Sequence, residues 1–299
     1  MIIKVKVPAT TANLGSGFDT LGIALSLHNF VYFSGQNNLQ LGILKNTRML
    51  RDNNNLIYKS AAKLFEVCGE QMPFDLKIYQ TTRIPVTRGL GSSSACIIAG
   101  LMGANRLLGL PLNGVDILKL ATEIEGHPDN VAPALFGGLV DSVCNNGEVY
   151  YVKHNVSTNL KFVVIVPNFK MSTNQSRLSL PSVVSHSDAV FNVSRSALFV
   201  SSIVTQKFEN LSVAVDDRLH QPYRLKLIDR ADEIFNLAYD FGAYGVCLSG
   251  SGPSIIAICD KRNKSFFRKM RNELNRMNLN QWKVLDLNAD NEGAGVEII

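Results

Sequence analysis

The sequence predicts an α+β protein of two domains, and three observations support this. The chain has 299 residues, of which 46% are hydrophobic, which is enough for a large core and two domains. Segments with the apolar alternation of strands are separated by segments with helical spacing. From residue 160 the expected order is strand, helices, strand, strand, helix, strand, the split βαβ pattern of ferredoxin-like domains. No glycine occurs from Glu148 to Phe241, and we place the boundary inside this stretch, giving domains of 1–155 and 156–299.

Composition excludes several classes of protein. The formal net charge is +5, a modest basic excess that suits an anionic ligand. The longest basic stretch, Lys261–Lys269, has the pattern of one solvated helix face, so no nucleic acid partner is expected. No apolar run approaches the length that spans a membrane, and the N-terminal residues lack the apolar core of a signal peptide. The five cysteines are scattered, with no Cys-x-x-Cys pair, which is typical of reduced thiols in a cytoplasmic protein.

The first domain is expected to begin with a strand at Ile2–Val7, which lies at a sheet edge in this prediction because Pro8 would end it. Asn53–Asn55 can cap a helix that runs to about Val67, and Asn113 can cap a later helix that Gly126 and Pro128 end. The other expected elements are strands at Leu21–Phe33, Leu39–Leu44, Phe74–Tyr79, Leu139–Val143 and Val149–Lys153, and a buried helix at Ala95–Leu108.

The second domain is expected to begin with a buried strand at Lys161–Val166. Gly242–Ala257 predicts a hairpin in which two strands flank a loop that contains Gly250 and Gly252. The other expected elements are helices at Asp188–Phe208, Leu225–Tyr239 and Lys264–Met277, a strand at Trp282–Leu287, and an edge strand at Val296–Ile299.

The stretch Ile84–Cys96, Ile-Pro-Val-Thr-Arg-Gly-Leu-Gly-Ser-Ser-Ser-Ala-Cys, has the layout of a phosphate cradle that opens a helix. Gly89 and Gly91 allow positive φ and a close approach of the backbone to a ligand, and the serines that follow can cap the helix. A helix N-terminus attracts anions, so a nucleotide phosphate is the natural ligand. The alternative is an ordinary Gly-Ser-rich turn, and the chain has no Walker motif, because no Gly-Lys dipeptide occurs in it.

Two further stretches carry polar residues in unusual settings. Between Pro8 and Thr20, small residues surround Asn13 and Asp19, which either bind a ligand or bond their own backbone in a turn. In Glu123-Ile-Glu-Gly-His-Pro-Asp-Asn130, two carboxylates lie in the last turn of a helix, where the dipole is negative and a cation would relieve them. The alternative is a solvated helix end in which Lys119 pairs with Glu123.

Five segments, in order, resemble the GHMP kinases, the family of galactokinase, homoserine kinase, mevalonate kinase and phosphomevalonate kinase. The first two are Pro8–Thr20 and the Gly-Leu-Gly-Ser-Ser-Ser-Ala cradle; the third family motif is similar to Gly242–Ala257. The form of the homoserine kinase branch appears across Glu125–Gly138, and in Ser-Thr-x-x-x-Arg177-x-x-Leu-Pro and Leu-His-x-Pro-Tyr-Arg224. The family implies an N-terminal domain like ribosomal protein S5 and a C-terminal ferredoxin-like domain, with nucleotide and substrate in the cleft between them.

The resemblance also implies the site. Glu125, with Ser93 or Ser94, would bind magnesium, and Glu125 and Asn130 would serve catalysis; relatives often carry more residues between Glu125 and His127. Asn55 would lie near the adenine, and no residue, Asp129 included, is assigned as a general base. The implied substrate-binding residues are Asn13, Asp19, His127, Asn130, Arg177 and Arg224. The implied nucleotide-binding residues are Pro85, Val86, Thr87, Arg88, Gly89, Leu90, Gly91, Ser92, Ser93, Ser94, Ala95, Asn55, Gly250 and Gly252.

The activity that the resemblance implies is transfer of the ATP γ-phosphate to the side-chain hydroxyl of L-homoserine, with magnesium, in threonine biosynthesis. Arg177 and Arg224 are expected to converge on the substrate carboxylate across the cleft from Asp19, because a planar guanidinium binds carboxylate with two hydrogen bonds. Taken alone, each arginine is a surface ion-pair residue and His127 a structural one. Two alternatives stay open: a kinase for another small alcohol such as mevalonate, and a sensor that binds ligand without catalysis. No membrane partner is expected; the sequence does not define the oligomeric state, and a homodimer is one assembly compatible with it.

Overall fold

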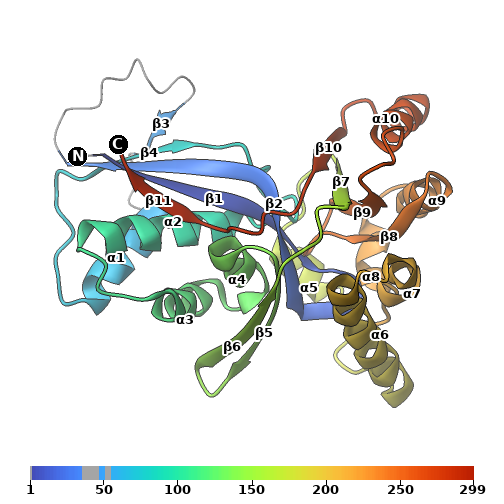
Figure 1. Cartoon of the computed structure of the whole chain (residues 1–299), viewed down its shortest axis with the longest axis horizontal. Helices are drawn as coiled ribbons and strands as arrows, with labels where there is room; N and C mark the ends of the chain where they lie inside the picture. Colours follow the sequence, from blue (N-terminus) through green and yellow to red (C-terminus); the bar gives the residue numbers. More distant parts are fainter. Residues whose placement is uncertain (1, 36–46, 51–54) are drawn as a thin grey trace.

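The computed structural model describes residues 2–35, 47–50 and 55–299 and contains two β-sheets with helices packed on them (Figure 1). Within these residues the first sheet has seven strands: β11, β1, β2, β4 and β3 lie side by side, and β5 and β6 continue from the other half of β2. Its strands are β1 (Ile2–Asn13), β2 (Gly17–Ser34), β3 (Arg48–Met49), β4 (Lys77–Thr81), β5 (Leu139–Asn145), β6 (Glu148–His154) and β11 (Gly295–Ile298). The predicted α+β class is confirmed.

Strand β1 is longer and more central than the sequence predicts. It pairs with β11 on one side and β2 on the other, so it is not an edge strand, and it continues through Pro8. The register with β2 shifts between Pro8 and Ala9, and such a bulge accommodates a residue that cannot donate a backbone hydrogen bond. Strand β1 therefore reaches Asn13 and carries that residue into the candidate site.

Two other strand predictions differ from the structure or lie beyond it. Strand β4 begins at Lys77 instead of Phe74, and Phe74 is fully exposed. The predicted strand at Leu39–Leu44 lies outside the described residues. By contrast, the strands predicted at Leu139–Val143 and Val149–Lys153 are present as β5 and β6, which pair as a hairpin with Val143 opposite Tyr150.

Four helices cover one face of the first sheet: α1 (Leu56–Val67), α2 (Ser92–Leu107), α3 (Gly114–Glu125) and α4 (Pro128–Phe136) (Figure 1). Asn55 caps α1 and Asn113 caps α3, as predicted, while 53 and 54 lie outside the described residues. The sequence pattern does not predict α4. Gly126 ends α3 in the left-handed region, but Pro128 does not simply continue the break; it starts a new helix, because proline is favoured at the first helical position.

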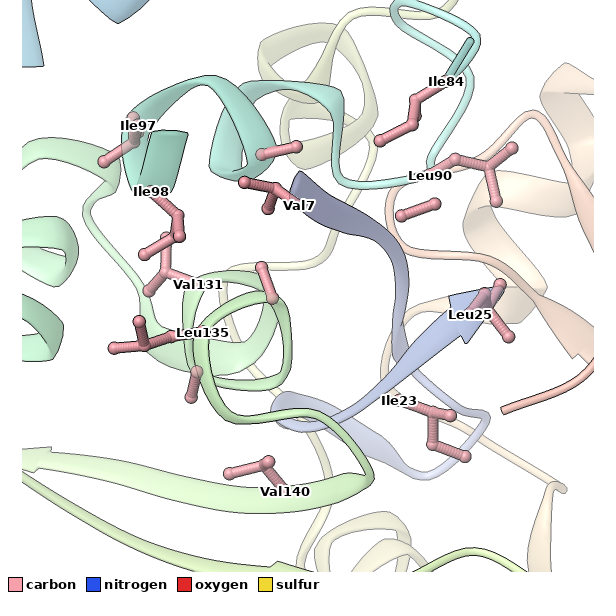
Figure 2. Packing of buried hydrophobic residues seen from close by; sticks show 14 of the residues in the cluster. Val7, Ile23, Leu25, Ile84, Leu90, Ile97, Ile98, Val131, Leu135 and Val140 are labelled. Carbon is pink, nitrogen blue, oxygen red and sulfur yellow. The ribbon is translucent and has the colours of Figure 1, made fainter. Parts of the chain in front are cut away.

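The core of the first domain lies between these helices and the sheet. Figure 2 shows Val131 and Leu135 of α4 beside Ile97 and Ile98 of α2, with Val7 of β1 and Val140 of β5 nearby. All six are buried, and the same apolar cluster continues to one face of the second sheet. The end of α3, the start of α2 and the start of α4 are therefore held together by packing, which brings their polar ends close in space.

The second sheet has the strand order β10-β7-β9-β8, all antiparallel, which is the order expected of the predicted split βαβ domain. Alternate residues of β7 face two different clusters, so Phe162 packs toward the first domain and Val163 packs against α9 and α10. The strands are β7 (Leu160–Val166), β8 (Ala243–Leu248), β9 (Ile255–Asp260) and β10 (Lys283–Leu287). The helices are α5 (Thr173–Leu178), α6 (His186–Thr205), α7 (Leu211–Ala214), α8 (Gln221–Arg224), α9 (Ala231–Asp240) and α10 (Phe266–Arg276).

One helix prediction in this domain is wrong. The expected helix at Leu225–Tyr239 is a short 3₁₀ turn at Leu225–Leu227 followed by α9, because Ile228 is extended and Arg230 is left-handed between them. Nowhere in the ranges that the structure describes is a helix both long and apolar enough to cross a bilayer.

The last strand returns to the first sheet. β11 pairs with β1 from Ile298 opposite Ile3 to Gly295 opposite Lys6. The preceding segment is tied to β2, because the Asp290 N–H donates to the Ala24 carbonyl oxygen and the Ser26 N–H donates to that of Asn288. The predicted boundary at residue 155 stays a prediction, and the chain crosses between the two sheets again near its C-terminus.

Candidate active site

A single cavity of about 430 Å³ is lined by residues of both domains. The residues of the predicted site that line it are Asn13, Asp19, Asn55, Val86, Thr87, Arg88, Gly89, Leu90, Gly91, Ser92, Ser93, Glu125, His127, Asn130, Arg177, Arg224 and Gly250. Pro85, Ser94, Ala95 and Gly252 belong to the same loops but do not line it. Segments that are up to 237 residues apart, such as Asn13 and Gly250, thus meet in one place.

The glycine cradle has the backbone that its sequence requires. Gly89 and Gly91 both have positive φ, and Gly91 is the N-cap of α2. A Cβ on Gly89 would lie 2.0 Å from the Ser249 carbonyl oxygen, so no larger residue fits. No side chain caps α2, which corrects the prediction that the serines do so. The first backbone N–H groups of α2 therefore have neither an acceptor within the helix nor a capping side chain, and they lie at the cavity.

Two of the cradle serines contact Glu125 instead. Ser93 Oγ donates to Glu125 Oε2 at 2.8 Å and Ser94 Oγ donates to Oε1 at 2.9 Å. Lys119 pairs with Glu148 and not with Glu123, so the predicted alternative of a Lys119–Glu123 pair is wrong. Within the part of the chain that the structure describes, no lysine or arginine forms an ion pair with Glu125. A carboxylate with two hydroxyls, at a helix N-terminus, is an oxygen-only set of the kind that magnesium prefers.

The start of α4 places His127, Asp129 and Asn130 at the cavity. His127 Nδ1 lies 2.5 Å from Asp129 Oδ1, and Asp129 is buried. Burial acts to lower the pKa of His127, but the hydrogen bond with Asp129 and the negative charges around it raise the pKa above its usual value. Asn130 accepts a hydrogen bond from Thr10 Oγ1 at 2.7 Å, which fixes its amide against β1.

Asp19 and Arg177 form a two-pronged ion pair, with Nη1–Oδ2 at 2.9 Å and Nη2–Oδ1 at 2.8 Å. The resemblance places them on opposite sides of the substrate; the structure brings Arg177 of α5 into direct contact with Asp19 near the start of β2. The hydrogen bonds with Asp19 raise the pKa of Arg177 above its usual value. Each side chain keeps about a third of its surface exposed, so the pair is open to a ligand.

Arg224 is a deeply buried charged group of the site, with 1% of its surface exposed. Its Nη1 lies 3.3 Å from His220 Nδ1 and 3.3 Å from the Gly250 carbonyl oxygen, while its Nε has no hydrogen-bond partner among the described residues. Burial, followed by the positive charge of Arg177, lowers its pKa to about 10, so it stays charged at neutral pH. A surface ion pair, the alternative for Arg224, is therefore wrong.

The loop of the β8–β9 hairpin supports the cradle from the second domain. Ser249 Oγ donates to the Gly89 carbonyl oxygen at 2.6 Å, and Asn13 Nδ2 donates to that of Gly250 at 2.7 Å. Asn13 Oδ1 also accepts from the backbone N–H of Asp19 at 3.0 Å, so the turn-forming alternative for Asn13 is realised in the structure. The side chain thus fixes backbone on two sides of the cavity.

Two predicted nucleotide contacts have other partners in the structure. Arg88 Nε donates to the Pro167 carbonyl oxygen and its Nη2 to that of Asn168, both at 2.9 Å, so its guanidinium joins the cradle to the end of β7. Asn55 Oδ1 accepts from the N–H of Ile57 as the cap of α1. Both residues still line the cavity.

Several residues of the site lack a signal in the sequence. Gln80 and Cys96 line the cavity, and burial raises the pKa of the Cys96 thiol to about 11. Thr10 and Phe18 are residue types that are ordinary in strands. His220 belongs to the segment Leu-His-x-Pro-Tyr-Arg224, in which the resemblance implies a role only for Arg224. Their roles depend on contacts between segments that are distant in the sequence, which no local pattern encodes.

Comparison with known proteins agrees with this geometry. The family model described as GHMP kinases N terminal domain matches residues 55–138, and the one described as GHMP kinases C terminal matches residues 199–276. The chain therefore belongs to the GHMP kinase family, a class of kinases built from these two domains.

Within that family, its relatives are homoserine kinases. The chain is 43% identical over 297 residues to a homoserine kinase of Clostridium beijerinckii, covering 99% of this chain and 98% of the relative. It is 44% identical over 298 residues to one of Caldicellulosiruptor saccharolyticus, covering 99% and 96%. A crystal structure of homoserine kinase from Cytophaga hutchinsonii superimposes with a TM-score of 0.86 at 29% identity, covering 99% of this chain and 97% of that one.

Proposed function

We propose that the protein is a homoserine kinase, which transfers the γ-phosphate of ATP to the side-chain hydroxyl of L-homoserine and so supplies threonine biosynthesis. The relatives support the activity, and one observation carries it in this chain. A single cavity has an uncapped helix N-terminus with Glu125 on one side and a buried arginine with an unmet donor, Arg224, on the other. The first is suited to phosphate and the second to carboxylate.

On the phosphate side, the backbone of Gly89–Ser94 would hold the triphosphate, with the adenine toward Asn55. Glu125, Ser93 and Ser94 would hold magnesium, since their oxygens already converge within hydrogen-bond distance of each other. When bound, the ion supplies neutralisation of phosphate charge as the phosphoryl group moves. Glu125 thus acts by placing negative charge opposite the start of α2, where the serine hydroxyls orient both of its oxygens.

On the substrate side, a zwitterion fits the charges of the cavity. The guanidinium of Arg224, which lines the cavity, would bind the α-carboxylate, and Asp19 would accept hydrogen bonds from the α-ammonium. Because Asp19 and Arg177 are paired, they offer both an acceptor and a donor at one place, which matches the two charges of an amino acid. Asn13, His127 and Asn130 would complete the substrate contacts. A simple acid such as mevalonate has no ammonium group to donate hydrogen bonds to Asp19.

The chemistry rests on positioning more than on proton transfer. Phosphoryl transfer needs alignment of the nucleophile with the phosphate and stabilisation of charge, and the cradle, Glu125 and Asn130 are placed for that. Asp129 is buried and hydrogen-bonded to His127 and Asn130, so its role here is to hold those two side chains. A cytoplasmic location and a homodimeric assembly remain predictions.

The test is ADP release measured with purified protein, ATP and magnesium across L-homoserine, D-homoserine and mevalonate. L-Homoserine should be used far better than the other two, because only it presents carboxylate and ammonium in the required hand. Equal use of mevalonate would point to a kinase for another alcohol. ATP binding without ADP release from any of the three would point to a ligand sensor.

A further inference from the structure

His220 lies behind Arg224 and has no exposed surface. Its Nε2 is 2.6 Å from the Gly15 carbonyl oxygen, and a carbonyl can only accept, so Nε2 carries a proton. Its Nδ1 is 3.3 Å from Arg224 Nη1, and a guanidinium can only donate, so Nδ1 carries none. The partners therefore assign the neutral Nε2–H tautomer.

The surroundings of His220 keep it in that state. Burial and the positive charge of Arg224 lower the pKa of His220 to about 4, although the negative charges of Asp217 and Asp19 and the hydrogen bond to Gly15 act to raise it. Asp217 Oδ2 lies 3.6 Å from His220 Nε2, but it also accepts from the backbone N–H groups of His220 and Gln221. Asp217 thus builds the turn before α8 while the imidazole faces Gly15 and Arg224.

Phe18 forms a second support. Its ring stacks on the His220 imidazole, with centroids 5.2 Å apart and planes at 26°. The guanidinium carbons of Arg224 and Arg177 lie 5.1 Å and 5.6 Å from the centroid of the same ring. The ring therefore contacts both arginines of the cavity, and Arg224 is held from two directions without being neutralised by a carboxylate.

We propose that His220, as the neutral Nε2–H tautomer, is a positioning residue that aims the Arg224 guanidinium at the substrate carboxylate, with the Phe18 ring as its partner. The proposal rests on the proposed function, which supplies the carboxylate. A neutral acceptor fits this role because it orients the guanidinium without competing with the substrate for its charge. His220 also links Arg224 to Gly15, so it holds α8 next to the turn between β1 and β2.

A matched pair of variants tests it. In His220→Asn the amide oxygen falls near the place of Nδ1 and can accept from Arg224; in His220→Gln the amide nitrogen falls near Nε2 and can donate to Gly15. The probes are L-homoserine and 3-aminopropan-1-ol, the same alcohol without its carboxylate. The kcat/KM for each, the KM for ATP and the thermal midpoint are measured.

If His220 positions Arg224, His220→Gln loses about tenfold in kcat/KM for homoserine, which corresponds to about 1.4 kcal/mol. It loses little for 3-aminopropan-1-ol and keeps its KM for ATP, while His220→Asn retains preference for the carboxylate. Equal losses in both variants, or equal losses for both alcohols, would overturn the proposal in favour of a purely structural role.

A second measurement does not depend on activity or on either variant. Imidazole ¹⁵N spectra of the wild-type protein report which ring nitrogen of His220 carries a proton. An unprotonated Nδ1 from neutral pH down to about pH 5 supports the assignment, and a protonated Nδ1 overturns it. If the wild-type protein releases no ADP with homoserine, the proposed function fails, and these spectra still decide the state of His220.

Discussion

At the scale of single residues, Glu125 offers the sharpest contrast with a neighbour. Glu125 accepts from Ser93 and Ser94, whereas Glu123, on the same turn of α3, is exposed. Glu125→Gln keeps the shape and removes the charge, so we expect kcat to fall about 100-fold or more, because charge stabilisation in the transition state is lost. Glu123→Gln is the matched control and should change kcat little. If the two variants behave alike, Glu125 is not the metal-binding residue.

Arg224 tests the carboxylate side. Truncating one partner of a desolvated charged contact costs about 2–5 kcal/mol, so Arg224→Ala should weaken homoserine use by roughly 30-fold or more, at about 1.4 kcal/mol per tenfold. Arg224→Lys should rescue poorly, because lysine lacks the planar fork. The KM for ATP should barely change, since the cradle belongs to the other domain. Steady-state kinetics with each substrate varied in turn gives the answer, and equal losses for both substrates would contradict the assignment.

His127 gives a pH dependence with a definite sign. Its pKa is raised in the folded protein, so its stabilising contribution is fully present below the unfolded pKa, about 6.5, and is lost as the pH rises through the folded value. We expect the free energy of unfolding of wild type to exceed that of His127→Gln by more at pH 6 than at pH 8.5. Denaturant unfolding at the two pH values measures it. A difference that does not change between them would show that folding leaves the pKa of His127 unaltered, and a smaller difference at pH 6 would show that folding lowers it.

At the scale of elements, the sequence predicts those features that depend on contacts between residues close together in the chain. Asn55 and Asn113 cap helices as their sequence indicates, and the Gly250 loop closes the predicted hairpin. The continuation of β1 past Pro8 is not predicted, because the bulge that accommodates Pro8 depends on pairing with β2. Helix α4 is not predicted either, because a proline two residues after a helix-terminating glycine is compatible with both a loop and the start of a new helix.

The candidate site follows the same division. The resemblance supplies the residues, and nearly all of them line one cavity. It brings Glu125 together with a cradle serine, but it does not supply the direct contacts: both Ser93 and Ser94 donate to Glu125, and Arg177 pairs with Asp19. Whether a hydroxyl caps its own helix or meets a carboxylate on another depends on the tertiary structure.

The cap of α3 allows a test of helix stability that should leave the candidate site unchanged. Asn113 accepts from the N–H groups of Val115 and Asp116, and Asp116 bonds back to its N–H. Asn113→Ala should lower the free energy of unfolding by about 0.5–2 kcal/mol, whereas Asn113→Asp keeps the cap and should cost little. Chemical denaturation measures both. Because Glu125 is at the far end of α3, kcat should stay near wild type; equal stability of the two variants would mean that the cap contributes nothing.

At the scale of the whole molecule, the cavity exists only where the two domains meet. Asn13 reaches Gly250, Ser249 reaches Gly89, and Arg177 reaches Asp19, so hydrogen bonds cross between the two sheets around the site. The chain also returns from β10 in the second sheet to β11, which pairs with β1, so a second covalent connection joins the two sheets. The relative placement of the domains, more than any one side chain, therefore sets the distance between the cradle and Arg224.

Variants of Arg88 can distinguish a role in holding the two domains together from direct binding of phosphate. Arg88 precedes Gly89 of the cradle, and its guanidinium donates to the carbonyl oxygens of Pro167 and Asn168 after β7. If Arg88 clamps the two domains, Arg88→Lys should fail nearly as badly as Arg88→Ala, because one ammonium cannot reproduce the two fixed donors. Both variants should then raise the KM for ATP and for homoserine together.

If Arg88 instead contacts phosphate, its charge is what matters. Arg88→Lys should then restore most of the affinity for ATP, the KM for homoserine should stay constant in both variants, and the effect of Arg88→Ala should shrink as salt is raised, since screening weakens exposed charge interactions. Measuring KM for each substrate at two ionic strengths for wild type and both variants distinguishes the two. We expect the clamp, because the structure already pairs this guanidinium with backbone carbonyls of the other domain, each at 2.9 Å.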